Sequence, residues 1–501
     1  MAGVLLLFVV LLYCLTLNPY WRVGWDSAIY ISLAKSLAAG QGYAYMGFGH
    51  TKYPPLFPLL LSAVIETCGT SFLAMRLTVL AFTVASVGIV YLLFRESGER
   101  WLGLATAALS GVSFAVLDKV RFVQSDLPFL FFVLLALYFL QKRSRFSSWH
   151  TLGLHLSLAA AFYTRTAGLA LFVAAIAFYG FAALRRRERS ELVKAVAVLF
   201  TTVVCVGAWS ARNATVANLI PPDLKEGETY AGEFLRPTSG APEIRPLEPA
   251  TWLRRLWHGA VNYSAICLAL LTGEQAQPAA PLYGLLALVL VGLIAALAAG
   301  PGPVEFYFLS YGVLLLLWPA TPGHRFLLPI VPMFFYYLLS GGRTVLRLLA
   351  RVAGREGSDK LAGMALAVAV MALLAANATL DARIIAQERA LPYYSGETAD
   401  FISGIRWLAA NVPADAVVIS DPSPPVYLLS GRRSVLPIPS DDPRQVLAAI
   451  EKHGSYLLYA PVAGGPRSLL PILRSFPDRF DEIYRQGSCV VYRVRPDERP
   501  Q

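Results

Sequence analysis

Long apolar runs separated by short polar segments dominate this chain. A helix needs roughly 20 mainly apolar residues to cross the hydrocarbon core of a bilayer. By that measure we predict membrane-spanning helices near residues 2–18, 72–94, 101–117, 127–141, 151–165, 167–184, 192–209, 281–299, 304–319, 326–341 and 361–378. The apolar segment 259–272 is short, so it is expected to be a half-span or an interfacial helix. The pattern predicts an all-α, multi-span membrane bundle of about 11 helices.

The pattern changes after residue 378. Residues 399–412 carry apolar residues at helical spacing, and residues 442–454 begin with an Asp cap and end with Gly. Strand-like runs of β-branched and aromatic residues, bounded by turn residues, occupy 416–421, 426–431, 455–461 and 488–494. A segment of this length buries its own core. We therefore divide the chain into a membrane bundle (1–378) and a small C-terminal α/β domain outside the membrane (379–501).

Composition excludes a soluble globule. The chain has 501 residues, of which 56% are hydrophobic and 15% charged, against about a quarter charged in soluble domains. The net charge of +11 does not indicate nucleic-acid binding, because the basic residues gather in short loops between apolar runs. These clusters are Arg95 and Arg100; Lys142, Arg143 and Arg145; Arg185, Arg186, Arg187, Arg189 and Lys194; and Arg343, Arg347, Arg351, Arg355 and Lys360.

All four basic clusters fall on one side of the membrane if the predicted spans alternate from a cytoplasmic N-terminus. Short loops rich in Lys and Arg mark the cytoplasmic side. The outer loops 19–71 and 210–258 and the C-terminal domain then lie on the periplasmic or extracellular side. The first run has neither a basic leader nor a small-residue cleavage site, so it is predicted to be an uncleaved span. Abundant Ala, Leu and Arg with compact loops favour a bacterial plasma (inner) membrane.

Ionisable residues cluster at the outer ends of the predicted spans. Such groups are costly at membrane depth and mark functional sites. They are Asp26, Lys52, Asp118, Arg121, Asp126, Arg165, Arg212, His324 and Arg325. They are far apart in sequence, but a helical bundle is expected to bring them together. The five cysteines are scattered, and no His, Cys, Asp or Glu cluster has ligand spacing, so no cofactor is predicted and a divalent metal is left without support.

Two carboxylates with several cations suit transfer from a phosphate-linked donor. A phosphate leaving group requires cations that neutralise its growing charge, and the acceptor requires a base, which a carboxylate with a raised pKa supplies. We therefore predict Asp26 and Asp126 as catalytic residues. Lys52, Arg121, Arg165, His324 and Arg325 are predicted to bind the donor phosphate. Trp25, Tyr30 and Tyr53, from the stretch Trp25–Pro58, are predicted to line the substrate pocket.

Structural roles are open for the same residues. Asp26 and Asp126 each precede a predicted helix and are therefore candidates for capping alone. Lys52, Arg121 and the pair His324-Arg325 are candidates for interfacial anchors. Arg165 lies in apolar sequence, so we expect it to have an anionic partner, either a side chain or a lipid phosphate. These alternatives make different predictions about where the side chains meet.

Four motifs in order along the chain resemble one superfamily. They are WDSAIY at 25–30, KYPPL at 52–56, RFVQSDLP at 121–128 and RFLLPIVP at 325–332. Their order and spacing resemble the GT-C superfamily of polyprenyl-phosphate-sugar-dependent glycosyltransferases, in the branch of the protein O-mannosyltransferases and the aminoarabinose transferase of lipid A. Relatives often carry two adjacent acids in the first loop, whereas Ser27 follows Asp26 here.

The resemblance implies an active site on the outer face, with a lipid-anchored sugar donor. It implies that Asp26 is the catalytic or acceptor-orienting carboxylate, and that Lys52, Arg121, His324 and Arg325 lie near the lipid phosphate. The acceptor is a lipid, a glycan or a protein, and no nucleic acid is expected. Two other function classes are weighed against it. A transporter or lipid flippase should carry polar groups at mid-membrane depth, and a non-catalytic scaffold would keep the fold with a dead site.

Overall fold

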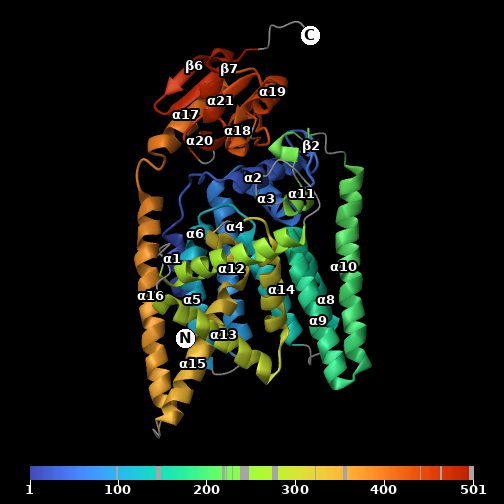
Figure 1. Cartoon of the computed structure of the whole chain (residues 1–501), viewed down its shortest axis with the longest axis vertical. Coiled ribbons are helices and arrows are strands. Elements are labelled where there is room, and N and C mark those ends of the chain that lie inside the picture. Colours follow the sequence, from blue (N-terminus) through green and yellow to red (C-terminus); the bar gives the residue numbers. More distant parts are fainter. Residues whose placement is uncertain are drawn as a thin grey trace.

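The computed structural model describes residues 1–96, 100–142, 148–216, 220–221, 223–227, 229–236, 248–272, 280–321, 323–353, 358–440, 442–462 and 465–495. Within these, upright helices form a bundle, and a five-stranded sheet with its own helices covers one end of it (Figure 1). A layer of short helices and one hairpin lies between the bundle and the sheet (Figure 1). The candidate site is built in this layer.

The bundle consists of long and short apolar helices. They are α1 (Ala2–Cys14), α4 (Phe72–Phe94), α5 (Arg100–Val112), α6 (Phe114–Val120), α7 (Asp126–Gln141), α8 (Ser148–Thr164), α9 (Leu169–Arg186), α10 (Arg189–Thr215), α12 (Pro249–Thr272), α13 (Ala280–Ala299), α14 (Pro303–Leu317), α15 (Val331–Val352) and α16 (Ser358–Arg389). Two 3₁₀ segments, η1 (Thr166–Gly168) and η3 (Gly323–Ile330), precede α9 and α15.

The chain is a multi-pass membrane protein. Among the described residues, five helices are long and apolar enough to cross a bilayer: Phe72–Phe94, Thr166–Arg186, Arg189–Thr215, Gly323–Val352 and Ala362–Arg389. The pair α5 and α6, bent by 48°, makes a sixth where the two are taken together as one broken span. Shorter apolar helices coincide with most of the other predicted spans, but the total of 11 stays a prediction. The ambiguous segment 259–272 belongs to one helix, α12, which lies across its upright neighbours (Figure 1).

Two of the four basic clusters can be placed at one end of the bundle. The turn between α9 and α10 and the end of α15 are opposite the end that the sheet covers (Figure 1). Arg143, Arg145 and Arg355 lie outside the described residues. These two clusters share a side, as the sequence predicted; the side of the other two clusters and the assignment of that side to the cytoplasm stay predictions.

The C-terminal segment contains the predicted mixture of helices and strands. Its elements are α17 (Gly396–Asn411), β3 (Val417–Ser420), α18 (Ser423–Ser430), β4 (Arg433–Val435), α19 (Pro443–His453), β5 (Tyr456–Tyr459), α20 (Gly465–Ser468), α21 (Leu470–Ser475), η4 (Pro477–Arg479), β6 (Phe480–Gln486) and β7 (Cys489–Val494). The sheet order is β4-β3-β5-β7-β6. β3 pairs in parallel with β4 and β5, whereas β7 pairs antiparallel with β5 and β6.

One predicted strand is wrong, because residues 426–431 belong to α18. Proline opens this helix in its first turn, where its missing N–H costs nothing. Gly431 ends it with a left-handed backbone, φ 72°. These end signals outweigh the short apolar run that suggested a strand. The boundary at residue 379 stays a prediction; α16 itself continues to Arg389.

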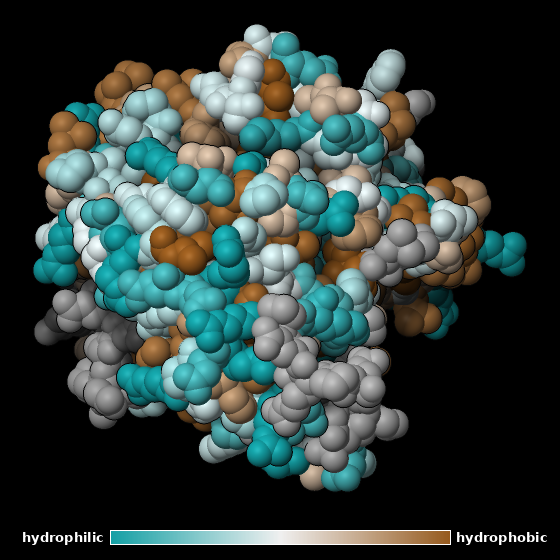
Figure 2. All heavy atoms as spheres, turned by 90° about the horizontal axis from the view of Figure 1, so that it is seen from above, coloured by the Kyte–Doolittle hydropathy of each residue, from teal (hydrophilic) through white to brown (hydrophobic). Residues whose placement is uncertain are grey.

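The outer end of the molecule is mostly hydrophilic. Seen from above, polar side chains cover most of the face over the sheet, with separate hydrophobic patches between them (Figure 2). By contrast, α10 and α16 leave apolar side chains exposed along their length, among them Phe200, Val203, Val368 and Met371. Exposed apolar helices and a hydrophilic end fit a bundle in lipid with its sheet in water.

Candidate active site

The layer beneath the sheet is formed by α2 (Trp25–Ala38), the hairpin β1 (Ala44–Tyr45) and β2 (Phe48–Gly49), α3 (Leu56–Cys68), η2 (Lys225–Gly227) and α11 (Tyr230–Leu235). Met46 and Gly47 join the two strands with φ values of 54° and 83°. Positive φ at both positions is typical of the two-residue type I′ turn. Tyr45 packs edge-on against Tyr427 of α18, with ring centroids 5.2 Å apart, so the hairpin contacts the C-terminal segment.

Asp26 and Asp126 lie in the first turns of α2 and α7. The N-caps of these helices are Gly24 and Ser125, and neither carboxylate makes a capping hydrogen bond. The alternative that the two acids serve only as caps does not fit this geometry. Both still gain from the partial positive charge of a helix N-terminus.

Arg325 joins the two carboxylates in one site. Its Nη1 lies 2.6 Å from Asp26 Oδ2, and its Nε donates to both oxygens of Asp126, at 3.0 and 2.9 Å. Arg165, at the break between α8 and η1, lies 2.5 Å from Asp126 Oδ1. Asp126 is thus the anionic partner that the sequence predicted for Arg165. Two acids and two arginines from four separate segments meet here.

The two carboxylates differ in access. The Asp126 side chain is 4% exposed and held by two guanidiniums, whereas the Asp26 side chain is 19% exposed and held by one. Burial of Asp26 acts to raise its pKa, but Arg325, the Tyr53 hydroxyl and Arg165 outweigh burial and lower it. The sequence-based expectation of a raised pKa does not hold for Asp26 in this arrangement. Asp26 is therefore ionised and accessible.

Tyrosines form one wall of the site. The Tyr53 hydroxyl donates to Asp26 Oδ1 at 2.8 Å, and the Tyr30 hydroxyl lies 2.7 Å from Ser125 Oγ. Their rings are 4.9 Å apart. The Tyr53 backbone N–H donates to Nε2 of His50 at 3.0 Å. Burial, Lys52 and Arg212 lower the pKa of His50 to about 3, so this imidazole is neutral and positions Tyr53.

Lys52 and Trp25 face the segment formed by η2 and α11. Lys52 Nζ lies 3.2 Å from Glu233 Oε2 and 5.3 Å from the Tyr230 ring centroid. Lys225 Nζ lies 4.5 Å from the Trp25 ring centroid. Lys52, the predicted phosphate-binding lysine, is therefore paired with Glu233 from the second outer loop. This pair lies next to Tyr53, which contacts Asp26.

Arg121 and His324 belong to a neighbouring cluster. Glu388, whose side chain is fully buried, lies 2.6 Å from Arg22, 2.9 Å from Arg76 and 3.2 Å from Arg121. Asp118 pairs with Arg121 and lies 3.3 Å from His324 Nε2. The sequence prediction missed Glu388 because its helix reads as an ordinary span whose last turns are polar. Arg212 supports the hairpin instead, through the carbonyls of His50 and Tyr43.

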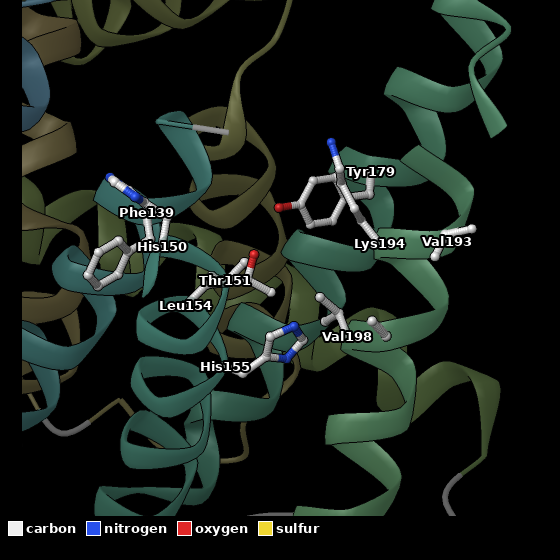
Figure 3. A pocket seen from close by; sticks show the side chains of 10 residues that line it. Phe139, His150, Thr151, Leu154, His155, Tyr179, Val193, Lys194 and Val198 are labelled. Atoms are coloured by element: carbon white, nitrogen blue, oxygen red, sulfur yellow. The ribbon is translucent and has the colours of Figure 1, made fainter. Parts of the chain in front are cut away.

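A separate cavity of about 170 Å³ lies at the other end of α7 and α8, between them and α9 and α10. His150, His155, Tyr179 and Lys194 are among the residues that line it (Figure 3). Lys194 is 2.8 Å from Glu191. Asp126 opens α7 and Phe139 lies near its end, so at 1.5 Å per residue the cavity is about 20 Å from the carboxylates. Among the described residues, no group of three or more His, Cys, Asp or Glu could hold a metal ion.

Comparison with known proteins supports the predicted resemblance. The family model of dolichyl-phosphate-mannose-protein mannosyltransferases matches residues 52–209. ArnT from Cupriavidus metallidurans, bound to undecaprenyl phosphate, aligns with a TM-score of 0.57 at 14% identity, covering 98% of this chain and 97% of that one. The chain has the GT-C fold. The apo form of ArnT matches this GT-C fold with a TM-score of 0.55 at 13% identity, over the same shares of both chains.

The oligosaccharyltransferase of Archaeoglobus fulgidus, tethered to an acceptor peptide, has a TM-score of 0.53 at 12% identity with the GT-C fold of this chain. That match covers 100% of this chain and 74% of the other. No curated protein matches the chain in sequence.

Proposed function

We propose that this chain is a membrane glycosyltransferase that moves a sugar from a polyprenyl-phosphate-linked donor to an acceptor on the outer face of the membrane, with inversion at the anomeric carbon. The observation that carries the proposal is the bridge from Arg325 to both Asp26 and Asp126. This bridge puts Asp26, whose side chain is partly exposed, beside the largely buried guanidiniums of Arg325 and Arg165. Undecaprenyl phosphate in the crystal structure of ArnT supports a polyprenyl phosphate carrier.

Asp26 is the proposed base. In a direct displacement the acceptor O–H or N–H gives its proton to Asp26 as the acceptor atom bonds to the anomeric carbon. The bond between that carbon and the phosphate oxygen breaks at the same time, and its electron pair remains on the phosphate. Asp26 is suited to this role because it is ionised and its side chain is 19% exposed. The more buried Asp126 is assigned to holding Arg165 and Arg325 in place.

The donor phosphate is assigned to the cations around these acids. Arg325 pairs with Asp26 itself, Arg165 pairs with Asp126, and Lys52 directly precedes Tyr53, whose hydroxyl donates to Asp26. Charge stabilisation of a leaving phosphate is strongest in a site with little water. A phosphate that draws Arg325 toward itself weakens the Arg325–Asp26 pair. The pKa of Asp26 then rises, so donor binding itself improves the base. Lys52 reaches the phosphate after leaving Glu233, which holds it at 3.2 Å.

The test uses purified protein in liposomes with a radiolabelled polyprenyl-phosphate sugar and an extract of the source membranes as acceptor. We expect Asp26→Asn to lower transfer by about 100-fold or more, the usual contribution of a general base. The matched control is Asp481→Asn, which removes an exposed carboxylate of β6 that pairs with Arg495. Transfer by Asp26→Asn within a few-fold of the wild type would remove Asp26 from the mechanism.

The same preparation separates the two other function classes. A flippase would move labelled lipid between leaflets of sealed liposomes without forming a new glycoside. A scaffold would do neither. Either result with the wild-type protein contradicts the proposed transfer.

A further inference from the structure

A second cavity lies where the bundle meets the C-terminal segment. It has a volume of about 260 Å³ and is formed by the loop after α1, the linker after α16 and the outer face of α17. Its polar walls are Tyr20, Tyr393, Tyr394, Ser403 and Arg406. In the part of the chain that the structure describes, no hydrogen bond or ion pair links these residues to Asp26 or Asp126, and the proposed transfer reaction does not use them. The cavity has room for one sugar ring and its substituents.

Aromatic rings dominate the cavity. Tyr20 and Tyr393 stack with centroids 5.0 Å apart and planes at 12°, and Tyr394 meets Tyr20 edge-on at 6.2 Å. The two linker tyrosines are fixed by their hydroxyls: Tyr393 donates to Glu388 at 3.2 Å and Tyr394 to the Trp21 carbonyl at 2.6 Å. Tyr20 is 42% exposed. Preorganised aromatic rings pack well against the C–H faces of sugars.

A cation completes the polar wall. Arg406 is exposed, and among the residues that the structure describes it forms no ion pair. It lies near the Tyr394 phenol: burial raises the pKa of Tyr394 to about 12, and Arg406 acts against that rise. An unpaired guanidinium beside aromatic rings suits a phosphate or carboxylate on the same ligand.

Exposed apolar side chains occur in the two chain segments that lead to the cavity. Leu391, next to the cavity-lining Pro392, is 80% exposed, and Leu15 at the end of α1 is 42% exposed. Arg389 donates to the Leu15 carbonyl at 3.0 Å, so the linker and the end of α1 lie side by side. The wall is also tied to the active site, because Trp21 Nε1 donates to Ser27 Oγ, one residue after Asp26, at 3.0 Å.

We propose that this cavity binds the headgroup of an anionic glycolipid acceptor, with a sugar ring on the tyrosines, its charged group on Arg406 and its chains along Leu15 and Leu391. Naming this lipid the acceptor rests on the proposed function; the binding itself does not. The combination of rings, cation and exposed leucines favours a lipid-anchored acceptor over a protein acceptor. Tyrosines of an ordinary interfacial belt would need neither a cavity nor a neighbouring guanidinium.

The test is photolabelling in phosphatidylcholine nanodiscs. The probe is phosphatidylinositol with a photoreactive acyl chain, which combines a ring polyol, a phosphate and a lipid tail. Matched phosphatidylcholine with the same photoreactive chain is the control lipid. Labelled peptides are mapped by mass spectrometry. We expect phosphatidylinositol to label segments 11–22 and 388–406, and Tyr20→Ala and Arg406→Gln each to reduce that labelling about tenfold.

Two further variants control for structure and charge. Tyr20→Phe keeps the ring and should keep the labelling, and Arg444→Gln removes an exposed arginine of α19 without effect. Equal labelling by the phosphatidylcholine probe, or labelling unchanged in Arg406→Gln, would overturn the inference. Consumption of the labelled sugar donor is measured in parallel. If the wild type consumes donor but the probe labels elsewhere, the cavity assignment alone fails; if the wild type consumes none, the proposed function fails.

Discussion

The buried carboxylate of Glu388 offers the sharpest test of how the outer layer is held together. It lies at the end of α16 and receives Arg22 from the loop before Asp26, Arg76 from α4 and Arg121 from the end of α6. Asn18 also donates to it at 2.9 Å. In Glu388→Gln, these guanidiniums keep their positions but lose the anion that balances them. Among the described residues, Asp118, which pairs with Arg121, is the carboxylate that remains to compensate.

The expected loss follows from burial. Removing one partner of a buried ion pair costs about 3–5 kcal/mol, because the other charge stays buried without compensation. The entropy of unfolding scales with chain length, so for about 500 residues 1 kcal/mol corresponds to about 1 °C of melting temperature. Glu388→Gln should therefore lower the midpoint of thermal unfolding by about 3–5 °C. The assay is the fraction of protein that stays monodisperse in detergent after heating.

Glu305→Gln is the matched control. Glu305 is also a buried acid, but it accepts from neutral donors, the Tyr337 hydroxyl at 2.9 Å and the Gly302 N–H at 2.8 Å. Neutral hydrogen bonds contribute about 0.5–1.5 kcal/mol each, so a smaller shift is expected. An equal shift in the two variants, or none in Glu388→Gln, would refute the argument that the charge of Glu388 holds the three arginines.

Three further predictions concern the site and the segment that covers it. Tyr53→Phe removes a hydrogen bond that lowers the pKa of Asp26, so the acidic limb of the rate profile should move up by about 1 pH unit. Lys52→Gln should raise the KM for the donor about tenfold or more, whereas Glu233→Gln should lower it by freeing the lysine. Burial raises the pKa of Glu226, in η2 (Lys225–Gly227), from 4.5 to about 7. Glu226 therefore holds a proton while η2 is docked against Leu436 and gives that proton up when η2 is released. The docking of η2 onto Leu436 is then strongest below pH 4.5 and weakens as the pH rises to about 7. The measurement is hydrogen exchange at the Lys225 amide, which donates to the Leu436 carbonyl. Glu226→Gln should remove this pH dependence.

The bundle was the predictable part of the fold. Every predicted span overlaps helical structure, although 101–117 is divided between α5 and α6 and 326–341 begins in η3. Length and apolar composition are what a bilayer requires of a span, so these helices could be predicted while their breaks could not. The strands at 417–420, 456–459 and 489–494 also followed from their β-branched residues. The segment 426–431 did not, because its helix depends on prolines and a glycine at its ends.

The candidate site was predictable in its residue types but only in part in its pairings. Asp26, Asp126, Arg165 and Arg325 meet, as expected for costly charges at the outer ends of spans. Local sequence does not indicate which cation joins which acid, since the pairings depend on the packing of distant helices. Arg121 and His324 therefore went unrecognised as partners of Asp118, and Glu388 was missed altogether. The roles assigned to these residues stay predictions.

The most direct measurement is a structure of the Asp26→Asn variant with an intact polyprenyl-phosphate sugar bound. The proposed mechanism predicts the phosphate in contact with Lys52 and Arg325, Glu233 moved away from Lys52, and the anomeric carbon facing the side chain at position 26. A donor phosphate seated on the Glu388 cluster, or in the cavity of Figure 3 at the opposite end of α7, would contradict it.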